Sequence, residues 1–329
     1  MSNSRGVKGD RARQVAEVAR RYYLGGESMV AISRELGISR FKVARLLKEA
    51  REMGMVKITL DLGGEEDPDL SKALAERLGL QRALVVRAYG SYDEIRRIVG
   101  RAAGCHLAET LGSGETLGLA WSRTLSEMIP SIEALPDIQV LQLTGSIGSD
   151  LSNSPIELVR HAALVSGNKA KAVLAPLYVD DAKAAEILRG QAHLQEVFEL
   201  YDTVTTAVVA VGGFRPTSNG STNSQLLSML PPPTHARIIQ AGAVAEVCGF
   251  PLRADGELAD PELADHIIAI RLDQLRLIRR VIAVATDPSK TEAILAMWRA
   301  NLLTELVVDI QLAEELLSAL RAIEREEIP

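Results

Sequence analysis

SMVAISRELGISRFKVARLLKEAREM, residues 28–53, decides the first domain of this chain. Its apolar residues recur at steps of three and four in two runs separated by Gly37, which predicts two helices joined by a turn. Ser28 and Ser39 stand where each helix would begin, and a serine oxygen caps the free N–H groups there. The pattern predicts a helix-turn-helix, whose second helix enters the major groove of DNA. The predicted buried face consists of Val30, Ile32, Leu36, Val43, Leu46, Leu47 and Ala50.

The other face of the second predicted helix is cationic. Arginine can hold guanine O6 and N7 with two hydrogen bonds, so Arg40 and Arg45 are the predicted base-contacting residues. Lys42 and Lys48 are predicted to contact phosphate, whereas Phe41 either touches a thymine methyl group or packs within the domain. An ordinary helix pair of a bundle is the alternative interpretation. The full predicted DNA-contacting set is Ser39, Arg40, Phe41, Lys42, Arg45 and Lys48.

Charge is distributed unevenly along the chain. The 329 residues carry a formal net charge of −6. Residues 1–60 contain 13 Lys and Arg against 6 Asp and Glu, whereas residues 61–329 contain 24 against 37. A small basic domain attached to a large acidic one is typical of a DNA-binding head on a body that binds something else. A structural nucleoid-type protein would not need such a body.

Two segments complete the predicted head, residues 1–62. A helix is predicted from Arg11 to Leu24, and the basic stretch 4–13 before it is either an arm that contacts phosphate or a terminus without a role. Residues 55–62, MVKITLDL, are rich in strand-forming residues and predict a wing strand. The head is therefore predicted to be a winged helix-turn-helix domain.

The predicted domain boundary follows from composition. GGEEDP begins the predicted linker, residues 63–69, and coincides with the change in sign of the charge. Residues 70–329 form the predicted second domain and begin with an amphipathic helix over 70–78. Cys105 and Cys248 are the only cysteines, which argues against a disulfide framework. The polar N-terminus and the absence of a long apolar run predict a cytoplasmic protein that does not enter a membrane.

Short apolar runs alternate with helical patterns in the second domain. This alternation predicts an α/β fold with a mostly parallel sheet covered on both faces, whose ligand site lies at the carboxyl ends of the strands. The predicted strands are residues 83–87, 115–121, 138–145, 171–177, 206–213, 266–270, 279–285 and 305–309, and the main predicted helices are 93–111, 155–166, 181–188, 290–300 and 310–327.

Small and hydroxylated residues follow four of these strands. They leave backbone N–H groups open to an anion, and a neighbouring Arg or Lys supplies the opposite charge. This composition favours a phosphorylated small molecule, while the alternative is that these residues merely build tight turns. The four segments are Ser122-Arg123-Thr124, residues 144–148, Gly212-Gly213 and residues 286–290.

Six motifs resemble the SorC family of bacterial transcriptional regulators, which is related to the DeoR-type sugar repressors. They are TLGLAWSRTL (116–125), LQLTGSIG (141–148), LAPLYVD (174–180), AVVAVGG (207–213), GAVAEVCGFPLRADG (242–256) and VIAVATDPSKTEAILAMW (281–298). The resemblance implies a body similar to the phosphosugar isomerase and sugar-phosphate deaminase fold. It also implies a dimer or tetramer whose binding to double-stranded operator DNA is altered by a phosphorylated sugar or polyol, with no cofactor.

The resemblance further implies the effector-binding residues. Ser122, Arg123 and Thr124 would form a turn that holds phosphate, and Glu246 would accept hydrogen bonds from sugar hydroxyls. Lys290 is either a second cation at the phosphate or a partner of Asp287. The glycines and serine that would line the same cavity are Gly145, Ser146, Gly212 and Gly213.

An enzyme with an appended DNA-binding head is the alternative function. Isomerisation or deamination of a sugar phosphate needs a positioned base and acid. The related deaminases carry Asp-Gly-His after the strand that here continues into Arg215-Pro216-Thr217-Ser218. The five histidines are scattered without metal-ligand spacing. We therefore expect a regulator of a carbohydrate catabolism operon, with no catalytic residue and no metal.

Overall fold

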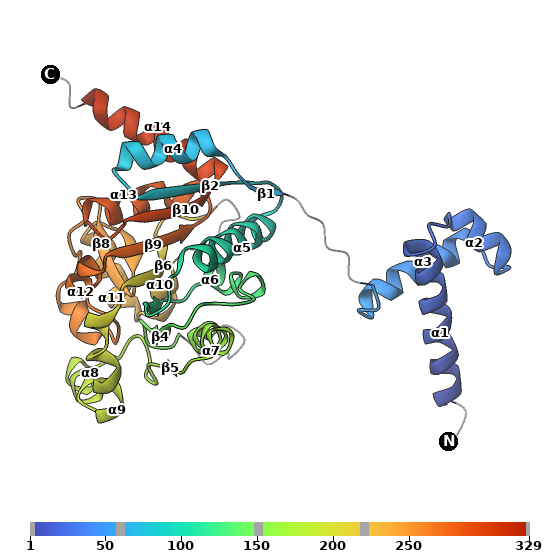
Figure 1. Cartoon of the computed structure of the whole chain (residues 1–329), viewed down its shortest axis with the longest axis horizontal. Coiled ribbons are helices and arrows are strands. Elements are labelled where there is room, and N and C mark those ends of the chain that lie inside the picture. Colours follow the sequence, from blue (N-terminus) through green and yellow to red (C-terminus); the bar gives the residue numbers. More distant parts are fainter. Residues whose placement is uncertain (1–3, 57–62, 148–153, 218–223, 327–329) are drawn as a thin grey trace. The chain divides into compact units, whose positions relative to one another are not determined.

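The computed structural model describes residues 4–56, 63–147, 154–217 and 224–326, with side chains described only within residues 11–325. It divides into two compact units, Met1–Asp61 and Leu62–Pro329, which we term the head and the body (Figure 1). In the described part of the chain, no helix is both long and apolar enough to cross a bilayer.

Three helices form the head: α1 (Ser4–Tyr23), α2 (Met29–Glu35) and α3 (Arg40–Glu52). The Ser28 side chain accepts a hydrogen bond from the Ala31 N–H, and the Ser39 side chain accepts one from the Lys42 N–H, each at 3.2 Å. Both caps and both helices are as predicted. The glycine between them, Gly37, has a φ of +62°, which other residues rarely adopt.

A small apolar core holds the three helices together. Of the predicted buried face, only Val30 is wrong, because it is 51% exposed. Val30 and Ile32 are two positions apart and so lie about 200° apart around a helix, which prevents both from facing one core. The buried core residues are Val15, Val18, Ala19, Ile32, Val43, Leu46, Leu47 and Ala50.

The segments around the helix-turn-helix differ in part from the prediction. Helix α1 begins at Ser4, so the expected arm over 4–13 is helical backbone; the chain there contains no proline that would stop the helix. Of the expected wing strand 55–62, residues 57–62 lie outside the described residues. Met55 and Val56 are described and form no strand.

The prediction of a linker over residues 63–69 is wrong. Gly63–Glu66 is strand β1, which pairs antiparallel with β2 (Arg82–Ala88), and Asp67 caps the helix α4 (Pro68–Leu78) that follows. A Gly- and Glu-rich composition resembles a linker, but backbone hydrogen bonds to a neighbouring strand do not depend on side chains. An ion pair between Glu66 and Arg82 at 3.0 Å also holds β1 to β2.

The body is built on one sheet with the strand order β1-β2-β10-β9-β6-β3-β4-β5. All neighbours in it are parallel except β1 and β2, as the alternating pattern predicted. The strands after β2 are β3 (Thr116–Leu119), β4 (Gln139–Gln142), β5 (Ala170–Lys171), β6 (Thr206–Gly213), β9 (Arg280–Ala285) and β10 (Glu305–Asp309).

The predicted strands 115–121 and 138–145 are shortened to β3 and β4, and two others form little or no strand. The run 171–177 yields only the two-residue β5, and 266–270 forms isolated bridges at Ile267 and Ala269 instead of a strand. The run 266–270 forms hydrogen bonds with two different segments instead of one neighbouring strand. The Ile268 N–H donates to the Leu177 carbonyl, and the Ile270 N–H donates to the Leu143 carbonyl. Its apolar side chains are buried all the same, which explains the strand-like pattern.

A hairpin that was not predicted extends β6. It consists of β7 (Ala243–Val247), antiparallel to β6, and β8 (Phe250–Arg253), antiparallel to β7. The turn is Cys248-Gly249, with φ values of +51° and +87°. Positive φ at both central residues is typical of a two-residue hairpin, where Asn-Gly is the usual sequence signal.

Helices cover the sheet in two groups (Figure 1). Helices α4, α13 (Thr291–Arg299) and α14 (Ile310–Glu326) contact one another, while α5 (Tyr92–Thr110) contacts α6 (Arg123–Ser126). The remaining α-helices of the described chain are α7 (Pro155–Ser166), α8 (Ala182–Arg189), α9 (Ala192–Phe198), α10 (Gln225–Met229), α11 (Pro232–Gln240) and α12 (Leu272–Leu277).

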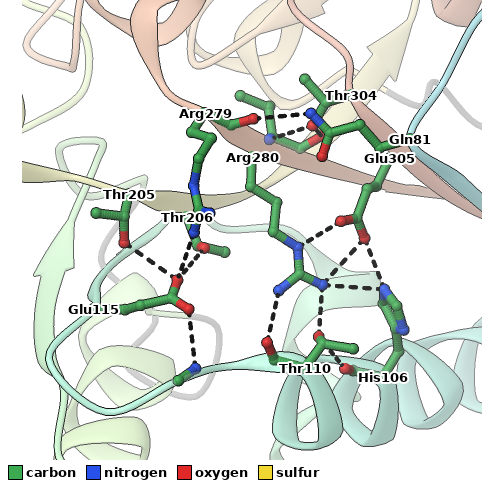
Figure 2. A network of polar contacts seen from close by, with 12 residues as sticks. Gln81, His106, Thr110, Glu115, Thr205, Thr206, Arg279, Arg280, Thr304 and Glu305 are labelled. Carbon is green, nitrogen blue, oxygen red and sulfur yellow. Dashed lines mark hydrogen bonds and ion pairs between the residues drawn. The ribbon is translucent and has the colours of Figure 1, made fainter.

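A buried polar network lies at the amino ends of the central strands (Figure 2). Arg280 begins β9 and donates to Glu305, the first residue of β10, at 2.5 and 3.1 Å. His106 of α5 lies 2.7 Å from Glu305, and Thr110 accepts from Arg280 at 2.5 Å. The network ties α5 to the sheet, leaving the opposite, carboxyl ends of the strands for a site.

Candidate functional site

The first candidate site is the exposed face of α3. Arg40, Arg45 and Lys48 are exposed and Lys42 is half-buried. Phe41 is 89% exposed, so the alternative in which it packs within the head is wrong. Ser39 uses its side-chain oxygen to cap the helix. This face offers cations and one aromatic ring, which suit phosphates and base edges.

Contacts behind α3 fix its orientation in the head. Arg11 of α1 donates to both carboxylate oxygens of Glu49, at 3.2 and 2.6 Å. The hydrogen bond from Arg11 lowers the pKa of Glu49. The Ser33 hydroxyl donates to the Ile38 carbonyl at 2.5 Å and so closes the turn between α2 and α3.

The second candidate site is a cavity in the body, at the carboxyl ends of β3 and β6 and beside β7. It encloses about 610 Å³ of empty space, part of it open to solvent. Parallel strands bring residues distant in sequence together at this edge. Six of the predicted effector residues line it: Ser122, Arg123, Thr124, Gly212, Glu246 and Lys290.

Two cations meet in this cavity. Arg123, at the start of α6, is exposed, while Lys290 is 6% exposed. Burial and the neighbouring charge of Arg123 lower the pKa of Lys290 to about 8. The nearby carboxylates of Asp287, Glu246 and Asp309 partly oppose this fall in the pKa. Two adjacent cations are suited to an anionic group.

Asp287 has other partners. Its side chain accepts a hydrogen bond from the Ser289 N–H at 2.9 Å, and its own N–H donates to Asp309 at 2.9 Å. These contacts hold the segment after β9 in a shape that delivers Lys290 to the cavity. Asp287 has a φ of +84°, which shows how tightly this segment turns.

A buried carboxylate lies on the wall formed by β7. Glu246 accepts hydrogen bonds from the Ser224 hydroxyl and from the Leu226 N–H, the latter at 2.9 Å, both through the same oxygen. Burial raises the pKa of Glu246, although these hydrogen bonds and Lys290 oppose the rise. A Cβ on Gly212 would lie 2.4 Å from Cγ of Glu246, so the glycine leaves room for the Glu246 side chain.

Three predicted residues do not line the cavity: Gly145, Ser146 and Gly213. The Gly145 N–H donates to the Ile268 carbonyl and the Ser146 N–H donates to the Ala175 carbonyl, each at 2.8 Å. A Cβ on Gly145 would lie 2.6 Å from the carbonyl carbon of Pro176. The backbone of Gly145 and Ser146 therefore joins separate segments of the body, and Gly213 pairs with Ala245 of β7.

Several lining residues were not predicted. Tyr92 begins α5 and does not follow a strand, so the pattern of residues after strands does not include it. Burial raises the pKa of Tyr92, which Arg123 partly opposes. Trp121 ends the predicted strand run 115–121, and its position was the available signal. Thr144 begins the segment 144–148 that was expected to face an anion, although it was not among the named effector-binding residues. No cluster of three His, Cys, Asp or Glu side chains able to hold a metal occurs in the residues that the structure describes.

Comparison with known proteins agrees with this arrangement. The family model described as "Putative sugar-binding domain" matches residues 64–318. The transcriptional regulator YjhU of Escherichia coli K12 is 28% identical over 305 residues, covering 90% of this chain and 92% of its own length. The deoxyribonucleoside regulator of Bacillus subtilis is 26% identical over 312 residues, covering 92% and 97%.

A solved structure has the same fold over nearly the whole chain. It is the full-length sorbitol operon regulator SorC from Klebsiella pneumoniae, with a TM-score of 0.69 and 22% identity, covering 94% of this chain and 99% of that one. The helix-turn-helix head and the sugar-binding body define a transcriptional regulator, and the relatives are named as regulators, not enzymes. The chain belongs to the SorC family of sugar-responsive transcriptional regulators.

Proposed function

We propose that the body cavity binds a phosphorylated sugar or polyol and that its occupancy controls the binding of operator DNA by α3 of the head. The regulated operon would serve carbohydrate catabolism. The protein would act in the cytoplasm, where the chromosome lies.

The observation that carries this proposal is the pairing of Arg123 and Lys290 in one cavity. Each would direct its positive charge to the same anion, and a phosphate can accept several charge-assisted hydrogen bonds at once. Desolvation makes Lys290 give up its proton more easily, and a bound phosphate dianion would reverse that tendency. Glu246 is a hydrogen-bond acceptor when ionised, so it suits the hydroxyl donors in the rest of the ligand.

The head would work in pairs. A single recognition helix makes few base contacts, and two linked heads combine two modest half-site affinities into one stronger one. A two-fold symmetric homo-oligomer, a dimer or a tetramer, would therefore bind a partly palindromic operator. The effector shifts operator affinity only to the extent that it binds the two arrangements of the oligomer differently.

Thermal unfolding of the full chain tests the ligand class. Aldose, ketose and alditol phosphates of four to six carbons are compared with the same compounds without phosphate. At a 100-fold excess over its Kd, the effector should raise Tm by about 5 °C or more, because binding to the folded state alone adds about 2.7 kcal/mol.

Variants locate the site. Arg123→Ala should abolish the rise in Tm, whereas Arg101→Ala, which removes an exposed arginine of α5 outside the cavity lining, should leave it intact. A rise in Tm that survives Arg123→Ala would contradict the assignment of Arg123 to the phosphate.

A further inference from the structure

Two side chains in the cavity wall carry hydrogen-bonding groups without partners. Trp121 is 9% exposed and Thr144 is 4% exposed, and both line the cavity. The indole Nε1 and the hydroxyl Oγ1 are buried, and neither has a hydrogen-bond partner within the described part of the protein. The indole N–H can only donate, so it calls for an acceptor.

The strand register places the two residues at matching positions. In the parallel pair of β3 and β4, Leu119 is the partner of Gln142. Trp121 and Thr144 each follow that last registered pair by two residues. The Leu143 N–H still donates to the Leu119 carbonyl at 2.9 Å, and Gln142 donates to the Thr144 carbonyl at 2.6 Å, so the backbone here is held in place.

Buried polar groups without partners are uncommon in folded proteins because they lose their hydrogen bonds to water. Such a loss is tolerated where a ligand supplies the missing partner. Arg123 and Lys290 are cations and would not accept from the indole N–H, and no acceptor of the described residues, Glu246 included, is bonded to it. A ligand oxygen would satisfy both groups at once.

We propose that Trp121 Nε1 and Thr144 Oγ1 form a neutral subsite for an oxygen of the effector, a hydroxyl or carbonyl, separate from the cations that hold the phosphate. This inference rests on the proposed function of the cavity. In this proposal Trp121 and Thr144 determine which phosphorylated compound binds. Arg123 and Lys290 bind any phosphate, whereas the neutral subsite requires an oxygen at one position of the carbon chain.

Matched threonine variants test the subsite. Thr144→Val removes the hydroxyl but keeps the shape, and Thr144→Ser keeps the hydroxyl. Thr286→Val is the control, since Thr286 is also buried with an unpartnered hydroxyl among the described residues but does not line the cavity. Trp121→Phe removes the indole N–H and keeps an aromatic ring.

Calorimetry measures binding of two probes: inorganic phosphate, and the compound of the sugar-phosphate series that raises Tm most. Thr144→Val and Trp121→Phe should each raise the Kd for the sugar phosphate about tenfold, which is the effect of losing one good hydrogen bond. Neither variant should change the Kd for inorganic phosphate. Thr144→Ser and Thr286→Val should bind both probes like the wild type.

Failure of the subsite and failure of the proposed function give different results. If the wild type binds a sugar phosphate and both Thr144→Val and Trp121→Phe bind it equally well, the subsite is wrong and the function stands. Equal weakening of both probes would likewise overturn the subsite, because it would indicate general damage to the cavity. If the wild type binds no sugar phosphate, both proposals are wrong.

Discussion

Phe41 illustrates what a single residue of α3 adds to the arginines beside it. An aromatic side chain that is 89% exposed loses contact with water only when a partner covers it. In the major groove, the methyl group of thymine is the apolar feature that such a ring can contact. We therefore expect Phe41 to distinguish thymine from other bases, while Arg40 and Arg45 are the residues expected to contact guanine.

We expect Phe41→Ala to lose this discrimination. With an operator selected from a random DNA pool, replacing one thymine of each of the two half-sites by uracil should weaken operator binding by the wild type about 15-fold, since each of the two buried methyl groups contributes about 0.8 kcal/mol. Fluorescence anisotropy should show the same affinity for thymine and uracil operators with Phe41→Ala. A variant that still prefers thymine would show that the ring does not contact the methyl group.

At the same scale, the sequence predicted residues that act through local chemistry. The caps Ser28 and Ser39 and the cavity cations Arg123 and Lys290 follow from what stands next to them in the chain. Gly145 was mistaken because its close approach to Pro176 joins segments more than 25 residues apart, which no local pattern reveals. Trp121 was overlooked because its unpartnered indole N–H is a property of the folded wall.

Among the elements, strands whose runs are continuously apolar were predictable, and the β7–β8 hairpin was not. Its turn holds Cys248 at positive φ, where asparagine or aspartate would have indicated a two-residue hairpin. Strand β1 escaped detection for a related reason, since Gly63–Glu66 has no apolar alternation and is held by its backbone and an ion pair. The expected strand 266–270 shows the opposite case, because this apolar run is buried but forms only isolated bridges and no strand.

The join between α5, β9 and β10 depends on Glu305. Burial opposes ionisation, but hydrogen bonds from His106 and Arg280 prevail and lower the pKa of Glu305. A carboxylate with a lowered pKa stabilises the fold above the pKa of the unfolded chain, about 4.3, and this contribution disappears as pH falls through the folded pKa.

Glu305→Gln should accordingly destabilise the body by about 3–5 kcal/mol at pH 7, because it leaves Arg280 buried without its anion. The difference from wild type should shrink below about pH 4, where the carboxyl becomes protonated. Unfolding in guanidinium is followed by tryptophan fluorescence, which reports the body because both tryptophans, Trp121 and Trp298, lie there. Glu133→Gln, at an exposed position, is the control, and an equal loss in both variants would contradict the role of the network.

For the whole molecule, the contrast in charge between the two parts was the most informative property of the sequence. Composition alone separates a basic head from an acidic body, and the structural division after Asp61 lies beside that change of sign. The parallel sheet then accounts for the cavity, because the carboxyl ends of β3 and β6 bring Arg123 and Gly212 to one edge.

The most direct test of the account measures operator affinity with and without the sugar phosphate that raises Tm most. In the wild type, the compound should change the Kd for operator DNA by about fivefold or more, the range of ordinary allosteric coupling. Arg123→Ala should bind the operator like the ligand-free wild type and should not respond to the compound. An unchanged Kd in the wild type, or the same response in Arg123→Ala, would contradict the claim that a phosphorylated ligand held at Arg123 controls the DNA-binding head.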